Sequence, residues 1–553
     1  MNSELILCSG IKLDRNYENV LSYNENTMLN LCRQNAIYTG NKYKIVGVRG
    51  NKINVSAKYA DCIYANYMAF INPNYGNKWF FAWITDVNLL NPDTTEITFV
   101  VDVFSTWYDR FVLGQAFIER EHVDDDTFGK HTIPEGLETG DFIINSLEEL
   151  GNTALNTRYI AMVYTGNPQQ LFPSYSAKEY TGLYTGYNYM ILASGLDADK
   201  MIQGFSDDGA LEMIYGFFTI PSGLIRSSVH WYNGPNATGD DVIEVGNGNY
   251  PMFALVPEDP VGSHNEITLL ANTNFNINTT INGYTPKNNK LFTGEYNYIY
   301  ATNNSGADIK YNYEDFINNQ PIFKIIGAIS IGCSIKLVPM NYKKFDTTSQ
   351  NTPVNGTYIY GINGGKYPTL GWTGDAYTNW LTQNAVNIAV GTVGNIGQIL
   401  GGVAMLGTGV TAVAGGSSIF SGFTGILNQL GEIRKHQLIS ETGSGNINAG
   451  DLAYSTKKMN FSMYRMSIKE ETARIIDNYF SRFGYKVNEV KTPNLNSRTK
   501  FNFIKVGGMD ELVSGNIPAN ALEEINSIFR KGVTIFHNYN DIGNYTISNP
   551  IVS

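Results

Sequence analysis

The residues from Ala376 to Gly431 constrain the fold of this chain more than any other feature. These 56 residues contain no Asp, Glu, Lys or Arg, although 16% of the whole chain is charged. The stretch "NIGQILGGVAMLGTGVTAVAGGSSIFSGF" (395–423) shows that the segment is also rich in glycine. Left in water, so apolar a segment would aggregate, and it therefore needs an apolar host.

The segment cannot order itself unaided. From Ile388 to Leu430 the sequence has 17 Val, Ile, Leu, Met or Phe side chains among 43 residues. Burying each gains about 1.5–3 kcal/mol, whereas fixing the backbone costs about 1–2 kcal/mol for every residue, and more for glycine. The host must be the rest of the protein, neighbouring subunits or a bilayer. A helical crossing takes about 20 residues, so the segment is long enough for two passes.

Two stripes at helical spacing flank a glycine-rich centre. The first runs from Val386 to Leu400, and the second begins at Ile419 and continues into the charged "EIRKH". We predict that the following side chains contact lipid or form a plug: Val393, Ile396, Ile399, Leu400, Val403, Met405, Leu406, Val410, Val413, Ile419, Phe420 and Phe423. The glycines expected to keep the loop pliable are Gly391, Gly394, Gly397, Gly401, Gly402, Gly415 and Gly416.

Three interpretations of the segment are open. A buried helical hairpin or a subunit interface is the simplest, but even buried helices usually carry a charged cap or face. A permanent transmembrane hairpin is disfavoured by the glycine content and by the lack of Lys and Arg on the N-terminal side. A segment that inserts conditionally, as fusion and pore-forming peptides do, accounts for both the glycine and the missing charge.

The rest of the chain has the patterns of β structure. In "TTEITFVVDVFSTWYD" the residues Ile97, Phe99, Val101 and Val103 recur at period two. The pair Gly50–Asn51 suits a tight hairpin turn. Residues 155–345 form short Tyr-, Asn- and Thr-rich runs between turns, which favours sandwich or barrel modules. We predict a mainly β fold of barrel or sandwich tube domains, with a few short helices and a long hydrophobic Gly-rich loop or helical hairpin.

Two helices are predicted near the C-terminus. "SIKEETARIIDNYFSRFG" has Ser467 and Glu470 in capping-box register, an apolar stripe that includes Ile475, and Gly484 as a stop. "NALEEINSIFRKG" repeats this pattern with Asn520 as the cap and Gly532 at the end. Both stripes are expected to be core faces.

These patterns predict five parts. They are an N-terminal β-rich tube domain (1–154), a middle β-rich part (155–345), a linker (346–375), the membrane-active loop or plug (376–431) and a C-terminal α+β part that completes the tube (432–553).

Composition and motifs argue against several functions. The net charge of −11 disfavours nucleic acid as a wrapped ligand, although not as cargo in an acidic conduit. Cys8, Cys32, Cys62 and Cys333 suggest neither a disulfide scaffold nor a metal site. Six scattered histidines form no HExxH motif, and no GxSxG or P-loop is present. We therefore expect no catalytic residues, no enzyme activity, no metal and no cofactor.

One acidic loop partly fits a calcium site. In "DDDTFGKHTIPE", Asp124, Asp126, Gly129 and Glu135 occupy ligand or turn positions, but Phe128 stands where an oxygen ligand is required. The simpler interpretation is a loop whose acids, together with His122, make structural hydrogen bonds.

Four stretches carry a family resemblance. "WYDRFVLGQAFIEREHVDDDTFGKHTIPEGLETGDFI" (107–143), "NYFSRFGYKVNEVKTPNLNSRTKFNF" (478–503) and "SGNIPANALEEINSIFRKGVTIFHNYNDIGNYTISN" (514–549) resemble tail knob proteins of small short-tailed bacteriophages. The stretch "YANYMAFINPNYGNKWFFAWI" (64–84) is also similar. The resemblance covers the N-terminal quarter and about the last 75 residues, and the apolar segment lies where the family carries its long apolar loops.

The resemblance implies a non-enzymatic virion tail protein, assembled in the host cytoplasm as a homohexameric distal tail tube. Genomic DNA would pass through the tube as cargo, and the apolar loops would plug it and then perforate the host cell membrane as a pore. Implied partners include a collar protein and a tail-tip lysin. The alternative is a receptor-binding or wall-degrading tail-tip protein whose apolar segment is only core or interface packing.

Overall fold

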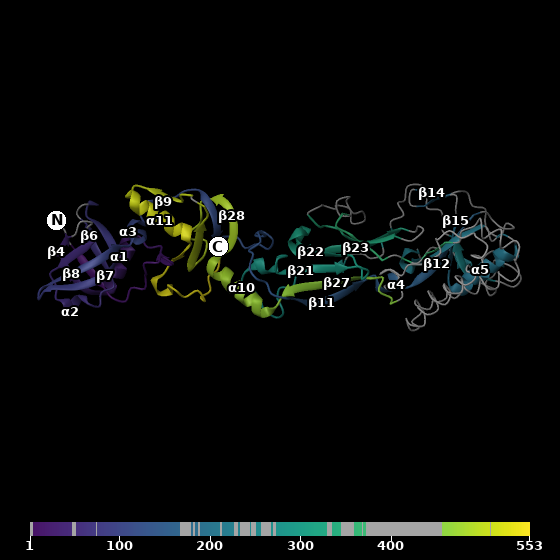
Figure 1. The fold of residues 1–553 in the computed structure, drawn as a ribbon, viewed down its shortest axis with the longest axis horizontal. Coiled ribbons are helices and arrows are strands. Elements are labelled where there is room, and N and C mark those ends of the chain that lie inside the picture. The colour runs from purple at the N-terminus through teal and green to yellow at the C-terminus, as the bar shows by residue number, and fades with distance from the viewer. Residues whose placement is uncertain are drawn as a thin grey trace, which may run out of the picture. The chain divides into compact units, whose positions relative to one another are not determined.

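The structure is a computed structural model of the chain. It describes residues 4–46, 51–72, 75–165, 178–180, 183–185, 188–208, 210, 213–225, 231–232, 244, 250–255, 267–268, 273–328, 334–343, 359–365, 367, 369–371, 456–508 and 510–552. These residues are mainly β, with several sheets and a few helices, as predicted (Figure 1). They form two compact units: unit 1 takes Met1–Asp141, Thr279–Tyr296 and Ile468–Ser553, and unit 2 takes Phe142–Asn278 and Asn297–Ser467. The five-part division stays a prediction.

The N-terminal part of unit 1 is a curled seven-stranded sheet. In sheet order its strands are β3 (Ala36–Gly40), β1 (Leu5–Cys8), β6 (Tyr67–Asn72), β7 (Lys78–Asn91), β8 (Thr94–Val101), β5 (Lys52–Val55) and β4 (Tyr43–Val46). The end strands β3 and β4 follow one another in the chain with only Asn41 and Lys42 between them. The two ends of the sheet therefore approach each other, as in a barrel. Strands β4 and β5 pair as the predicted hairpin, whose turn residue Gly50 lies outside the described residues.

The period-two pattern of β8 is confirmed as far as Val101. Ile97 and Phe99 are buried, but Val103 does not continue the strand and instead opens helix α3 (Val103–Trp107). The cause is Asp102, whose carboxylate accepts hydrogen bonds from Ser105 N (3.0 Å) and from the hydroxyl of Tyr67 (2.8 Å). A side-chain cap of this kind starts a helix where the strand pattern would run on.

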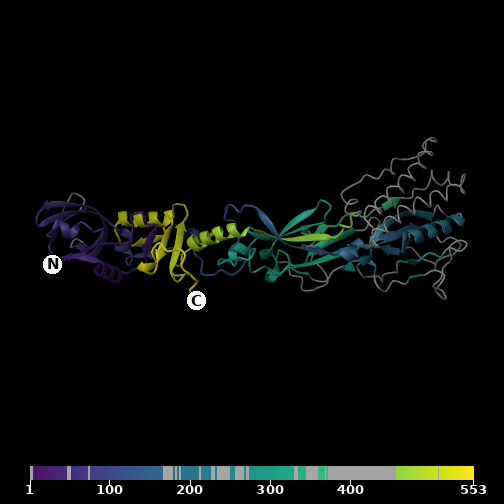
Figure 2. The ribbon, with the colours of Figure 1, turned by 90° about the horizontal axis from the view of Figure 1, so that it is seen from below.

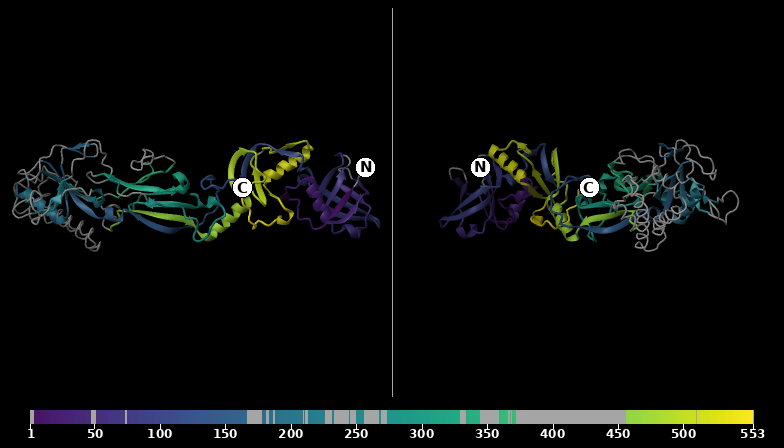
Figure 3. Two further views of the ribbon diagram at one scale, coloured as in Figure 1. Left: turned by 180° about the vertical axis from the view of Figure 1, so that it is seen from behind. Right: turned by 45° about the vertical axis from the view of Figure 1, so that its right-hand side comes forward.

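A second sheet in unit 1 combines strands from both ends of the chain. Its order is β2 (Asn19–Leu21), β31 (Val533–Phe536), β29 (Phe501–Val506), β10 (Ala116–Glu121) and β28 (Tyr485–Lys491). Strands β9 (Phe111–Leu113) and β30 (Val513–Gly515) pair separately. The α-helices in the described part of unit 1 are α1 (Glu25–Gln34), α2 (Tyr59–Cys62), α3, α10 (Glu470–Phe483) and α11 (Ala519–Lys531). Helix α11 lies across the strands of the second sheet (Figure 3, left).

The two C-terminal helices end where predicted but begin differently. Gly484 and Gly532 end α10 and α11 with φ of 65° and 90°. The predicted N-caps are wrong, because Ser467 belongs to a strand and Asn520 lies inside the first turn of α11. The predicted core position Ile475 is also wrong, since this side chain is 70% exposed.

The described residues of unit 2 form three larger sheets. The first has the order β11 (Phe142–Leu150), β27 (Phe461–Ile468), β21 (Asn297–Thr302) and β22 (Asp308–Asn312); Figure 1 shows these strands next to one another, and Figure 2 shows the chain from below. The second has the order β17 (Trp231–Tyr232), β18 (Phe253–Leu255), β15 (Asn188–Leu192), β12 (Arg158–Tyr164), β16 (Ile214–Pro221) and β26 (Thr369–Gly371). The third has the order β19 (Ile267–Thr268), β23 (Ile322–Ala328), β24 (Ser334–Pro339) and β25 (Ile362–Asn363), with β20 (Thr273–Asn274) also on β23. Strands β13 (Lys178–Tyr180) and β14 (Leu183–Thr185) form a hairpin.

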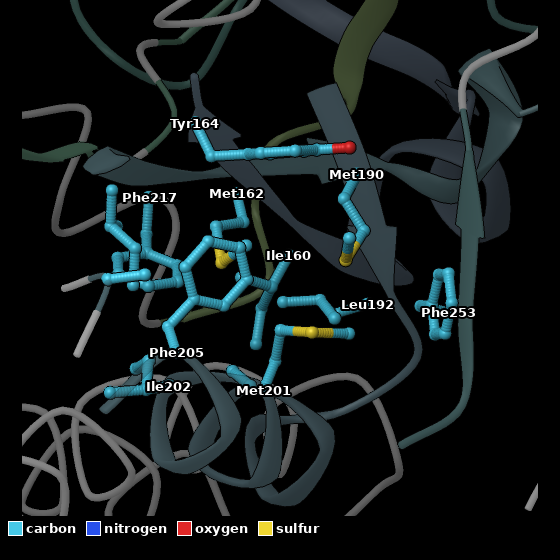
Figure 4. Packing of buried hydrophobic residues seen from close by; sticks show 13 residues of the cluster. Ile160, Met162, Tyr164, Met190, Leu192, Met201, Ile202, Phe205, Phe217 and Phe253 are labelled. Atoms are coloured by element: carbon cyan, nitrogen blue, oxygen red, sulfur yellow. The ribbon is translucent and has the colours of Figure 1, made fainter. Parts of the chain in front are cut away.

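Helix α5 (Gly195–Asp207) covers one face of the second sheet of unit 2. Met201, Ile202 and Phe205 of the helix are fully buried against Met162 and Leu192 of the strands (Figure 4). Unit 2 therefore has a hydrophobic core of its own between this helix and the sheet.

Candidate functional site

All the residues predicted to contact lipid or to form the plug, from Gly391 to Phe423, lie in 372–455, outside the described residues. The structure does describe the chain on both sides of this stretch. We call the described residues of 359–371 the entry flank and residues 456–460 the exit flank. Both flanks belong to unit 2.

The entry flank is built into two sheets. Ile362 of β25 pairs with Leu337 of β24, and Leu370 of β26 pairs with Phe217 of β16. Between these strands Tyr367 is buried, and its hydroxyl donates a hydrogen bond to the carbonyl oxygen of Leu155 (3.0 Å). The strand pairing and the Tyr367 hydrogen bond therefore hold the entry flank in place as far as Gly371.

Leu155 belongs to the short helix α4 (Asn152–Asn156), and the exit flank is bound to this helix as well. The amide of Met459 donates to Oδ1 of Asn156 (3.1 Å), and Met459 is fully buried. The Lys458 ammonium bonds a carboxylate oxygen of Glu149 at 2.9 Å, just before α4. Because Leu155 and Asn156 are neighbours, α4 contacts the entry flank and the exit flank at adjacent positions.

A turn between β21 and β22 makes a second connection between the flanks. The Asn303 amide donates to the carbonyl of Asn363 in the entry flank (2.9 Å). The next residue, Asn304, donates to the carbonyl of Asn460 in the exit flank (2.8 Å). We call this arrangement of α4, the turn and the two flanks the loop base.

The two flanks touch at Gly365. A Cβ at this position would lie 3.1 Å from Cε of Met459, so a glycine allows the exit flank to pack directly on the entry flank. Sequence reasoning missed the loop base, and the only local signal was the turn-like stretch "TNNSGA" (302–307).

The loop base is held together mainly by neutral groups. Among its described residues an ion pair joins Lys458 and Glu149, whose side chains are 53% and 29% exposed. The hydrogen bond from Lys458 lowers the pKa of Glu149. The remaining connections described above use amides, carbonyls and one tyrosine hydroxyl, which do not titrate near neutral pH.

The acidic loop of unit 1 has a structural role. The side chain of Glu135 is fully buried and pairs with both Lys290 and Arg120. It also accepts a hydrogen bond from the amide of Lys486 (3.0 Å). We call Glu135, Lys290 and Arg120 the ion cluster. Glu135 would be the ligand at position 12 of a calcium loop, but its carboxylate is already paired with the two cations. Burial lowers the pKa of Lys290.

The neighbouring groups confirm the hydrogen-bonding interpretation of this loop. Asp126 accepts from the amide of Asn289 (3.0 Å) and from the hydroxyl of Tyr485 (2.7 Å). Nδ1 of His122 accepts from the amide of Phe503 (2.8 Å), so its Nε2 carries the proton that faces the carbonyl of Ser481 (3.1 Å). Burial lowers the pKa of His122 to about 3.

The described ranges contain neither a metal-binding cluster nor a membrane-spanning helix. Among these residues no three His, Cys, Asp or Glu side chains are placed to hold a metal ion. No helix within the described ranges combines the length and apolar character needed to cross a bilayer. The cysteines that the structure describes, Cys8, Cys32 and Cys62, are buried free thiols.

Comparison with known proteins assigns the chain to a class. Residues 1–111 match the family described as Caudoviral major tail protein N-terminus, a family of phage tail proteins. Residues 265–550, more than half of the chain, match the family described as Bacillus phage phi29, tail knob protein gp9, C-terminal domain. The chain belongs to this tail knob family and is a structural component of the virion tail.

The similarity to individual relatives extends over nearly the whole chain. The tail knob protein gp9 of Bacillus phage PZA is 26% identical over 93% of this chain and 92% of its own length. That of Bacillus phage phi29 is 25% identical over 94% and 93%. The solved structure of the tail knob protein gp12 of bacteriophage C1 has a TM-score of 0.59 and 15% identity, and it covers both chains completely. The latter comparison shows a shared fold.

Proposed function

We propose that six copies of this chain form the distal tube of the tail, through which genomic DNA leaves the virion. We further propose that residues 376–431 plug this tube and later enter the host cytoplasmic membrane as a pore. The chain does this work without catalysis. The observation that carries the proposal is the run of 56 residues without a charge in a tail knob protein.

The uncharged run needs shelter from water until it acts. The uncharged run is too apolar for water, and six copies around one axis would bring six such segments together and hide them from solvent. In the membrane the same lack of charge lowers the cost of insertion. The acidic net charge of −11 is consistent with DNA that passes through without sticking.

The loop base supports the proposal from the described residues. Because α4 and the Asn303–Asn304 turn hold both flanks, the intervening segment can leave its shelter while its two ends stay attached to a folded unit. A segment whose ends were loosely held would unravel unit 2 as it emerged. The loop base therefore fits a function in which the segment moves and the tube does not.

A vesicle leakage experiment tests the proposal. The full chain should release dye from liposomes, and a variant that lacks residues 385–430 should assemble into the same ring but release none. A matched control replaces 385–430 with a Gly/Ser linker of equal length, which keeps the spacing but removes the apolar side chains. A six-fold ring with an axial hole should be visible by electron microscopy for all three proteins.

The contrary outcomes are equally clear. If the deletion variant fails to assemble while the full chain causes no leakage, the segment is packing material, and the receptor-binding or wall-degrading alternative gains. If the full chain is monomeric at all concentrations, the tube itself is wrong.

A further inference from the structure

Helix α5 covers one face of the second sheet of unit 2. Ile160 and Met162 of β12 belong to the core between this helix and the sheet (Figure 4). Side chains alternate along a strand, so Tyr159, Ala161 and Val163 project to the other side of the sheet. We call the side of Ala161 and Val163 the second face.

The second face is apolar and buried. Residues directly opposite each other in neighbouring antiparallel strands project to the same face. Ile191 of β15 and Phe218 of β16 lie opposite Ala161, and Ala254 of β18 lies opposite Ile191. These four side chains and that of Val163 are each at most 3% exposed. Another part of the chain must therefore cover them.

The described elements supply little of this cover. Within the described ranges, the elements that pack closely on the strands of this sheet, other than the strands themselves, are α5 and α4. Helix α5 is on the other face. Helix α4 lies at the end of β16, where the amide of Ser222 donates to the carbonyl of Thr157 (2.7 Å). The rings of Tyr159 and Trp231, whose centroids are 5.2 Å apart, border the second face and are only half-buried.

The chain leaves and rejoins the described residues at opposite ends of this sheet. Gly371, the last residue of the entry flank, lies opposite Gly216, which lies opposite Val163. The exit flank returns at α4, just before Arg158 opens β12. Arg158 and Val163 are about 17 Å apart along the strand, at 3.3 Å per residue. Residues 372–455 must therefore return along the length of a sheet whose other face α5 already occupies.

We propose that residues 386–400 lie on the second face in the free subunit and leave it when the segment acts. The inference deepens the proposed function, on which it rests for the release step, because it names what shelters the segment before six copies meet. The stretch "VNIAVGTVGNIGQIL" has no charge. As a helix its fifteen residues would be about 22 Å long, close to the length of β12. Five aliphatic side chains in it recur at helical spacing: Val386, Val390, Val393, Ile396 and Leu400.

Other stretches outside the described residues fit the second face less well. Residues 233–243 and 256–266, on either side of β18, carry two and three acidic residues. An unpaired charge is costly to bury, so neither is suited to cover an apolar face. The second apolar stripe, which begins at Ile419, lies farther from Gly371 in sequence and runs into the charged "EIRKH".

Photo-crosslinking in the full chain tests the contact. A diazirine-bearing aliphatic residue in place of Val393 should link to the peptides that contain Ala161 or Ile191. In place of Asn395, about 200° further round the helix, the same group should give at most a tenth of these products. Mixing isotope-labelled with unlabelled chains identifies the products within one chain, because they carry a single label. Adding liposomes should reduce the products, because the proposed function takes the stripe to lipid.

A charged variant supplies a second measurement. Val393→Asp with Ile396→Asp puts two charges on the apolar side of the stripe and should remove the cover of the second face. The amides of 158–164 should then exchange hydrogen at least tenfold faster. The matched control Asn395→Asp with Gln398→Glu adds the same charge away from the stripe and should leave this exchange unchanged. The amides of 501–506 in unit 1 should exchange alike in all three proteins.

The contrary outcomes separate this inference from the proposed function. If Val393 links to neither strand, or if the charged variant exchanges as the unaltered chain does, the inference is overturned whatever the leakage experiment shows. Products that join two chains would overturn it as well, as would a link from Phe423 of the second stripe in place of Val393. If the contact forms within one chain but persists with liposomes, the docking stands, and the release fails together with the proposed pore.

Discussion

The ion cluster of unit 1 and the loop base of unit 2 perform the same task by different chemistry. Each joins chain segments that are far apart in sequence. In unit 1 the carboxylate of Glu135 binds Lys290 and Arg120, three buried charges. In unit 2 the amides of Asn156 and Asn304 hold the exit flank without a buried charge.

The difference predicts how the two units respond to conditions. A buried charge left without its partner is costly, and buried ionisable groups make stability depend on pH. Losing a neutral amide contact costs less free energy, and such contacts make stability depend less on pH. Unit 1 should therefore be sensitive to acid and to single charge deletions, whereas the loop base should keep its two flanks together over the same range. Four experiments would sharpen or break this contrast.

The largest effect is expected for Glu135→Gln. The substitution keeps the shape but leaves the buried Lys290 and Arg120 without the carboxylate that pairs with both, which should destabilise unit 1 by about 3–5 kcal/mol. Hydrogen exchange of 279–296 in increasing urea measures the loss. The control Lys505→Gln breaks a pair with Glu119 in which both side chains are 36% exposed, and should cost less than about 1 kcal/mol. Equal costs for both variants would contradict the assignment.

Acid should act next most strongly, through His122. Its pKa is about 3 in the folded chain and about 6.5 in the unfolded chain. Below pH 6.5 the unfolded state binds a proton that the folded state excludes, so stability falls as pH falls, by about 1.4 kcal/mol per unit down to pH 3.

At pH 4.5 this amounts to about 2.7 kcal/mol. The difference in unfolding free energy between the unaltered chain and His122→Gln, followed from pH 7 to 4.5, isolates the histidine from Glu121 and Asp126. Burial raises the pKa of both carboxyls, so they act in the opposite direction. A constant difference over this range would show that His122 does not titrate as inferred.

A smaller effect is expected for Asn156→Leu at the loop base. The change removes the acceptor for the buried amide of Met459, which should cost about 1–3 kcal/mol. Faster hydrogen exchange at 456–460, with the exchange of 279–296 unaltered, is the expected result. The exposed Asn496 in unit 1 gives the control Asn496→Leu. Full protection of the exit flank in the Asn156 variant would remove α4 from the loop base.

The smallest effect is expected for Lys458→Gln. This residue forms the ion pair of the loop base, but its side chain is 53% exposed, so its loss should cost less than about 1 kcal/mol. Exchange of the exit flank in 0.5 M salt should then match that of the variant in low salt, because salt screens exposed pairs. A cost comparable to that of Glu135→Gln would end the contrast between the two units.

Sequence patterns predicted the parts of the fold that depend on local backbone chemistry. The glycines at 484 and 532 ended their helices as expected, because a positive φ at a helix end is a property of the residue itself. The alternation of apolar residues located β8, because this alternation likewise follows from local backbone geometry. The helix starts failed, because Ser467 is bound to Asn145 of another strand and was not available as a cap.

The candidate site also has a part that the sequence predicts and a part that it does not. A run without charge is visible in any reading of the sequence, and so is its need for an apolar host. The loop base was not predictable, because Asn156, Asn304 and Asn363 contact their partners across long sequence separations and follow no periodic pattern. Helix α5 was also missed, because its cap Ser194 and its apolar stripe lie among Gly- and Asp-rich residues typical of turns.

The contact of Gly365 with Met459 has an evolutionary consequence. The chain between them is an insertion whose two ends lie in contact. Doubling the length of such an insertion costs only about 0.6 kcal/mol of loop-closure free energy. Natural selection can therefore lengthen, shorten or replace this insertion without redesigning the folded unit that carries it.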